Sequence, residues 1–294
     1  MNASDSNLIT RAYLDSILIE TRYINGCEPD TTFEFFGRSF PTPIMSAALS
    51  HLDRFMFDGA MRLYAEGMAA SGALMWLGMT NDREAEMCAA TGASIVEIIK
   101  PYADRECIYA RIRKAEELGF LAVGVDIDHS FGSDGKNDVV NGCDMRPLNS
   151  AELTELKRST RLPFIVKGVL SEYDLKACKA AGADGVVISH HNNRIAYALP
   201  PARFLRETDE TLLSGISVFA DCVINSGADA FKYLCLGAQG VCVGRPLMTA
   251  IKEAGAQGVS DWVRRETAAL RKYMAFTGCK DLKHTDKSVL HFEK

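Results

Sequence analysis

The strongest constraint on the fold of this chain is a regular alternation of short apolar runs with longer stretches of helical spacing. This pattern predicts strands that alternate with helices. The eight predicted strands span residues 42–46, 73–77, 95–99, 122–125, 164–166, 185–188, 217–220 and 240–243. The predicted helices include residues 54–71, 105–118, 172–181, 228–236 and 246–276. Gly119, Gly182 and Gly237 each follow a helical run, where a left-handed cap is expected.

The predicted strands belong to one parallel sheet. Runs such as Phe-Ile-Val at 164–166 lack polar alternation, which is typical of parallel strands covered on both faces. Eight such units in 294 residues, without a linker rich in Pro or Ser, favour a single α/β (β/α)8 TIM barrel. An open doubly wound sheet with an extra lobe is the alternative.

The predicted barrel occupies residues 41–294 and includes a long C-terminal helix. Residues 1–40 are predicted to form an N-terminal helical extension. Within it we expect a helix over residues 8–23 and a small β element over residues 32–39.

Composition narrows the class of protein. Lys and Arg number 33 against 38 Asp and Glu, and the net charge of −5 gives no electrostatic reason to expect a nucleic-acid partner. The nine cysteines are scattered and form no C-x-x-C pair, so we expect reduced thiols and a cytoplasmic protein. No stretch has the length and hydrophobicity of a signal peptide or a transmembrane helix, so no membrane partner is expected.

Polar and charged residues gather just after the predicted strands, where barrels carry their active sites. Gly244-Arg245-Pro246 suits a phosphate site at a helix N-terminus, although a plain helix started by proline also explains the triplet. Lys167 ends the run at 164–166 and would stabilise negative charge on a bound ring or enolate. A structural ion pair of Lys167 with Asp126 or Asp221 explains it equally well.

Two adjacent histidines follow the strand at 185–188. Neighbouring residues at a strand end point to opposite sides, so only His190 or His191 faces the barrel axis. An imidazole oriented by Asp126, with Arg194 to hold an anion, is typical of a general base. Surface histidines are the alternative. No metal site is predicted, because no H-x-x-x-H or H-x-H spacing accompanies the pair.

Three segments carry a more specific signal: PFIVKGVLSEYDLKACKAAGADGVVISHHNNR, VFADCVINSGADAFKYLCLGAQGVCVGRPL and MAFTGCKDL. They resemble the FMN-dependent α-hydroxy-acid oxidase and dehydrogenase family. The likeness runs nearly without gaps from about residue 162 to 288 and more loosely back to about residue 13. Its most specific parts are V-K-G-V, S-x-H-x-x-R and D-x-F-K-x-L-x-L-G-A followed by V-G-R-P.

The resemblance implies a barrel that carries FMN at its C-terminal mouth. His191 would be the base and Asp126 its partner, and Arg194 would hold the substrate carboxylate. Lys167 would stabilise the anionic reduced flavin. The other positions that match the family's cofactor site are Ser46, Ala47, Ala48, Gly78, Ser189, Asp221, Gly244 and Arg245. Gly78 stands where the family usually has a flavin-contacting serine.

The chain departs from the family pattern at several of these places. The usual S-N-H-G-[GA]-R reads S-H-H-N-N-R, and the phosphate loop D-G-G-V-R-R reads D-C-V-I-N-S, so that Asn225 replaces a phosphate-binding arginine. Lys100 replaces a substrate-facing tyrosine. Because most of the usual carboxylate contacts are missing, we expect Lys100, with His129 or His190, to supply positive charge to the substrate. A larger substrate that enters a more open mouth is the alternative.

The sequence thus predicts an FMN-dependent oxidoreductase that oxidises a small anionic 2-hydroxy acid or a related hydroxylated substrate. His191 takes a proton, and hydride passes to flavin N5. A redox-neutral flavin enzyme such as an isomerase, or a flavin-binding protein without turnover, is the alternative. The electron acceptor is open among oxygen, a quinone and a partner protein, and the resemblance implies a homo-oligomer, tetramer or octamer.

Overall fold

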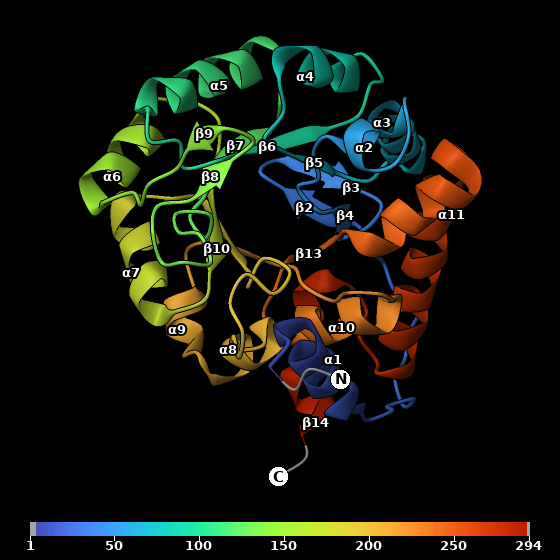
Figure 1. Ribbon diagram of the computed structural model, residues 1–294. Coiled ribbons are helices and arrows are strands. Elements are labelled where there is room, and N and C mark those ends of the chain that lie inside the picture. The colour runs from blue at the N-terminus through green and yellow to red at the C-terminus, as the bar shows by residue number, and fades with distance from the viewer. Residues whose placement is uncertain (1–3, 293–294) are drawn as a thin grey trace.

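The computed structural model describes residues 4–292, and its centre is a ring of eight parallel strands surrounded by helices (Figure 1). The strands run in the order β4-β13-β12-β11-β10-β7-β6-β5. Their bounds are β4 Ile44–Ser46, β5 Met75–Gly78, β6 Ile95–Ile99, β7 Ala122–Asp126, β10 Phe164–Val169, β11 Gly185–Ile188, β12 Ser217–Ala220 and β13 Gly240–Val243. The predicted (β/α)8 barrel is confirmed.

Backbone hydrogen bonds close the ring between its first two strands. Ser46 N donates to Leu74 O at 3.2 Å, and Gly78 N donates to Leu49 O at 3.0 Å. Between them, Ser46 Oγ accepts from Trp76 N at 2.9 Å. The Ser46 side chain therefore takes the place of a ladder bond at the seam of the barrel.

The sequence patterns located the strands because all eight are buried on both faces. Four predicted strands, at 95–99, 185–188, 217–220 and 240–243, match the observed bounds, and the other four differ by one to three residues. The three glycines expected at helix ends, Gly119, Gly182 and Gly237, all have positive φ angles.

The outer layer holds helices whose bounds are α2 Leu52–Phe55, α3 Ala60–Ser71, α4 Asp82–Ala89, α5 Arg105–Glu117, α6 Ser150–Arg158, α7 Glu172–Ala181, α8 Pro201–Glu207, α9 Glu210–Leu213, α10 Gly227–Cys235 and α11 Arg245–Phe276. The single helix expected over 54–71 is divided, because Asp53 accepts from the backbone N–H groups of Gly59 and Met61 and so caps a new start. The long α11 is kinked at Ala254 and Gly255.

The segment before β4 has more structure than the predicted helix. Helix α1 spans Ser6–Ser16 and ends earlier than expected, because β1 (Ile17–Ile19) pairs with β14 (Leu290–Phe292). Helix α1 lies beside α8 (Figure 1). The predicted β element is a hairpin of β2 (Phe33–Phe35) and β3 (Arg38–Phe40), whose aromatic rings pack on Trp76 and Phe219 inside the barrel.

A short hairpin of β8 (Val139–Val140) and β9 (Cys143–Asp144) lies in the long loop between β7 and α6. Two 3-10 helices, Leu282–His284 and Lys287–Val289, precede β14. Within residues 4–292, no helix combines the length and apolar character needed to cross a membrane.

Candidate functional site

A cavity opens at the C-terminal ends of the strands. It encloses about 820 Å³ of empty space, including its opening to solvent. Its walls come from the loops after β4, β11, β12 and β13 and from β10. The predicted site residues among its lining are Ala47, Ala48, Lys167, His191, Asp221, Asn225, Gly244 and Arg245.

Three predicted cofactor residues lie behind this lining. Ser46 belongs to the seam of the barrel. Gly78 lies so close to the next loop that a Cβ atom there would be 2.6 Å from Ala48 O, so the serine expected from the family has no room. Ser189 Oγ accepts from His191 N at 3.0 Å and thus supports the loop that carries the histidine.

Lys167 is the buried cation at the centre of the site. Its Nζ lies 3.7 Å from Asp221 and 3.8 Å from both Asp126 and Asp128. Burial by itself lowers the pKa of this ammonium group, but the three carboxylates outweigh burial and raise it. Lys167 is therefore charged, and it forms the structural ion pairs considered from the sequence while also lining the cavity.

Asp126 was expected to pair with the histidine, but its shortest ion pair is with Lys100. Lys100 Nζ lies 2.6 Å from Asp126 Oδ2, and both side chains are buried. Burial raises the pKa of Asp126, but Lys100, Lys167 and His191 hold it well below its usual value. Lys100 is thus a partner inside the protein rather than an exposed anchor for substrate.

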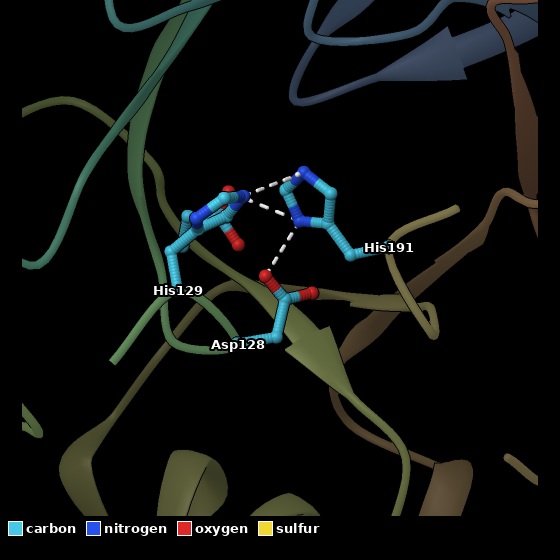
Figure 2. A group of neighbouring side chains, drawn as sticks. Asp128, His129 and His191 are labelled. Atoms are coloured by element: carbon cyan, nitrogen blue, oxygen red, sulfur yellow. Dashed lines mark hydrogen bonds and ion pairs between the residues drawn. The ribbon is translucent and has the colours of Figure 1, made fainter. Parts of the chain in front are cut away.

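The shortest carboxylate contact of His191 is instead with Asp128. His191 Nδ1 lies 2.5 Å from Asp128 Oδ1 and 3.4 Å from Asp126 Oδ2. Figure 2 shows Asp128 and His129 pointing toward the His191 ring. The sequence analysis did not single out Asp128. The sequence feature that accompanies Asp128 is Gly168. A side chain at position 168 would clash with Asp128, because its Cβ atom would lie 2.5 Å from Asp128 Oδ2.

Opposing effects set the pKa values of this pair. Burial and Lys167 lower the pKa of His191, but Asp126 and Asp128 outweigh them and raise it. Burial and the neighbouring Asp126 raise the pKa of Asp128 to about 6. The two carboxylates therefore favour the protonated form of the His191 ring.

His129 forms a second imidazole in the site. Its Nε2 lies 3.1 Å from His191 Nε2, and its Nδ1 lies 3.1 Å from Asp138 Oδ2. Burial, followed by the positive charge of Lys100, lowers the pKa of His129 to about 3. Arg194 completes the group, because its guanidinium pairs with Asp138 and donates to Phe131 O.

Donor atoms of Asp126, Asp128, His129 and His191 all lie within 4.8 Å of one another. Their two carboxylates are matched by the ammonium groups of Lys100 and Lys167. This compensation disfavours a metal ion at the same place.

His190 does not share the cavity with His191. Its Nε2 lies 2.8 Å from Thr10 Oγ1 of α1, and the ring is buried between the helix and the barrel. The substrate contact expected for His190 therefore does not form, because neighbouring residues at the strand end point to opposite sides.

The loop after β12 keeps an unusual backbone shape. Cys222 and Val223 have φ angles of 74° and 59°, at the two positions where the family pattern has glycine. This conformation costs non-glycine residues on the order of 1–3 kcal/mol each. Burial raises the pKa of the Cys222 thiol, so the cysteine is not a reactive thiolate. The strain indicates that the loop shape itself is required.

The residues of the cavity fit FMN. Helix α11 begins at the cavity wall, and Arg245 forms no ion pair with any residue in the range 4–292. A helix N-terminus with a free guanidinium suits the phosphate. Asp221 offers an acceptor for hydroxyl groups, and the buried Lys167 offers a positive charge at the other end.

Comparison with known proteins agrees with this geometry. The family model described as FMN-dependent dehydrogenase matches residues 4–154 and 144–292. Glycolate oxidase 1 from Zea mays is 29% identical over 86% of this chain and 78% of its own. Glycolate oxidase from Spinacia oleracea is 28% identical over 88% and 80%.

The fold has solved counterparts. A crystal structure of mandelate oxidase with (S)-2-phenylpropionate has a TM-score of 0.88 and 24% identity, and it covers 99% of this chain and 90% of its own. The family match spans nearly the whole chain, and the strand ends carry a basic, histidine-containing cavity that suits the cofactor. This chain therefore belongs to the FMN-dependent dehydrogenase family.

Proposed function

We propose that this protein is an FMN-dependent oxidoreductase that oxidises a small 2-hydroxy acid, or a related hydroxylated anion, to the 2-oxo product. The observation that carries the proposal is the His191–Asp128 pair, whose histidine lines the same cavity as Lys167 and Arg245. Matched relatives named glycolate oxidase and 2-hydroxyacid oxidase support this substrate class.

In this proposal, the residues at one end of the cavity bind the cofactor and His191 at the other end accepts the substrate proton. Gly244 and Arg245 would hold the cofactor phosphate, Asp221 would accept from its hydroxyl groups, and Lys167 would offset negative charge. Bound FMN would supply the two-electron acceptor, taking hydride at N5 from the carbon that bears the hydroxyl. Because Asp128 occupies Nδ1 of His191, Nε2 is the atom that accepts the substrate proton. His129 Nε2, 3.1 Å away, shares that proton.

The substrate anion would contact Arg194. Its side chain is 27% exposed, and its present partner is a single carboxylate, Asp138. A substrate carboxylate would exchange with Asp138 there. Lys100 would act indirectly, because its charge holds Asp126 ionised beneath the histidine.

The test is anaerobic mixing of the FMN-loaded protein with 2-hydroxy acids of increasing size. We expect loss of the oxidised flavin absorbance together with one equivalent of 2-oxo acid per flavin. Conversion of the hydroxy acid to an isomeric product of the same oxidation level, without flavin bleaching, would establish the redox-neutral alternative. Bound flavin with neither bleaching nor product, across the whole substrate series, would establish a non-catalytic flavin protein.

The pH dependence of the reaction distinguishes Asp128 from Asp126 as the orienting carboxylate. His191 must lose its proton to act as a base, and its pKa is raised, so kcat/KM is expected to rise with pH and level off above that pKa. Asp128→Asn removes one charge that favours the protonated ring. The acid limb is therefore expected to move to lower pH by about one unit, measured from kcat/KM profiles.

Asp134→Asn is the matched control, because Asp134 lies in the same loop with an exposed side chain. Its profile is expected to coincide with the wild-type profile. An unmoved acid limb in Asp128→Asn would show that Asp128 does not govern His191.

The nine cysteines are free thiols, which supports a reducing compartment and hence the cytoplasm. We propose a homo-oligomer, tetramer or octamer, on the family resemblance alone. Oxygen, a quinone and a partner protein are the candidate electron acceptors.

A further inference from the structure

We propose that helix α1 completes the cofactor site, with Arg11 binding the phosphate of FMN in place of the arginine missing from the β12–α10 loop. The inference rests on the proposed FMN site and extends it to a segment that the sequence analysis treated only as an extension. It assigns an anion-binding task to one side chain, and that task is measurable apart from catalysis.

The loop between β12 and α10, which borders the proposed phosphate site, contains no cationic side chain. Asn225 stands where the family pattern has arginine, and its backbone N–H donates to Asp229 at 2.9 Å. Arg245, at the start of α11, is the cation that the barrel itself supplies there. A phosphate dianion is better matched by two cations than by one.

Arg11 reaches this place from α1. It lines an open hollow together with Asn225, Arg245 and Pro246, next to the main cavity. Its guanidinium donates to both oxygens of Asp229, at 2.9 and 2.8 Å, and to Val223 O at 3.3 Å. The strained loop after β12 is therefore held directly by Arg11.

The contacts of Arg11 leave room for an anion. Its Nε–H is shielded from solvent and has no hydrogen-bond partner within residues 4–292. Asp229 is a fixed partner with a side chain only 5% exposed, whereas Asp15, 2.7 Å from the guanidinium, is 65% exposed. Exposed pairs of this kind contribute little, so a phosphate oxygen can replace Asp15 and satisfy the buried N–H.

Helix α1 also forms hydrogen bonds with the loop that carries His191. Ser6 N donates to Asn193 Oδ1 at 2.8 Å, and Asn7 Nδ2 donates to Asn192 Oδ1 at 3.1 Å. His190 contacts Thr10. These three loop residues are the ones that depart from the family's S-N-H-G-[GA]-R, so the departures are accounted for by the docking of α1.

The test compares two flavins that differ only in the phosphate. Full-length protein stripped of flavin is titrated with FMN and with riboflavin, and binding is followed by flavin fluorescence. Arg11→Gln is expected to weaken FMN binding by about tenfold to a hundredfold and to weaken riboflavin binding far less. Asp15→Asn removes the competing carboxylate and is expected to tighten FMN binding only.

Arg22→Gln is the matched control, because Arg22 is an N-terminal arginine that pairs with Glu20 and Asp286 and does not line the cavity. Arg11→Lys keeps a charge beside Asp229 and so preserves the fold if Arg11→Gln is unstable. It lacks the Nε–H, and we expect it to lose FMN affinity selectively as well.

Equal losses for FMN and riboflavin, or no loss for either, would overturn the phosphate assignment and leave Arg11 a structural residue. Wild-type protein that binds riboflavin as tightly as FMN would overturn it too. Wild-type protein that binds neither flavin would instead overturn the proposed function on which the inference rests.

Discussion

Replacing His191 with asparagine is expected to lower kcat/KM by about 10²- to 10⁴-fold, the usual contribution of a general base. Asparagine cannot take up the substrate proton at the place of Nε2, whereas the cavity walls formed by Lys167 and Arg245 are unchanged. The variant is therefore expected to remain yellow. The measurements are steady-state kinetics and the flavin absorption of the purified variant.

His284→Asn serves as the control, because His284 is exposed and paired with Asp281 on a 3-10 helix near the C-terminal end. It is expected to keep wild-type kinetics. A yellow His191→Asn protein that turns over at nearly the wild-type rate would exclude His191 as the base.

Replacing Lys167 with methionine is expected to destabilise the fold by about 3–5 kcal/mol at neutral pH. The change leaves the carboxylates of Asp126, Asp128 and Asp221, at most 13% exposed, without their shared cation. For a chain of this size, the loss corresponds to a fall in Tm of roughly 6–15 °C, measured by thermal unfolding with and without FMN.

The pH dependence of this loss has a defined sign. Without the ammonium group, the pKa values of the buried carboxyls rise above those in the unfolded chain, so the folded variant binds protons more readily. The deficit relative to wild type is expected to be largest at pH 8 and to shrink toward pH 5. Lys157→Met, which breaks the partly exposed pair with Asp184, is the control and is expected to cost about 1 kcal/mol or less. Equal Tm losses in the two variants would contradict the central position assigned to Lys167.

The barrel was predictable from the sequence because its strands are uniformly apolar and end in polar residues. A strand buried on both faces, such as β11, has a clear start and end. The same logic predicted Lys167 and Arg245 at the C-terminal side of the barrel, and both line the cavity: Lys167 from within β10 and Arg245 from the start of α11. The predicted C-terminal end of helix α1 was wrong. The helix stops where Ile17 pairs with Phe292, and a local sequence pattern cannot predict a pairing between residues so far apart in the chain.

The partners within the site were less predictable. Asp128 lies beyond its strand, and its contact with His191 depends on the path of a loop and on the space left by Gly168. Charge alone made Lys100 a candidate for substrate binding, but the register of β6 beside β7 places it against Asp126. The contacts of α1 join residues about 180 positions apart, and periodicity carries no information about such pairs.

The aromatic hairpin of β2 and β3 has a kinetic consequence. Phe33 and Phe35 pack on Trp76 and Phe219 inside the barrel, and none of these four residues lines the cavity. Substrate and a small electron acceptor are therefore expected to reach the flavin through the same loop-lined mouth and to compete for it. Turnover is expected to alternate between two half-reactions, with the 2-oxo product leaving before the acceptor enters, and plots of reciprocal rate for the two reactants should be parallel.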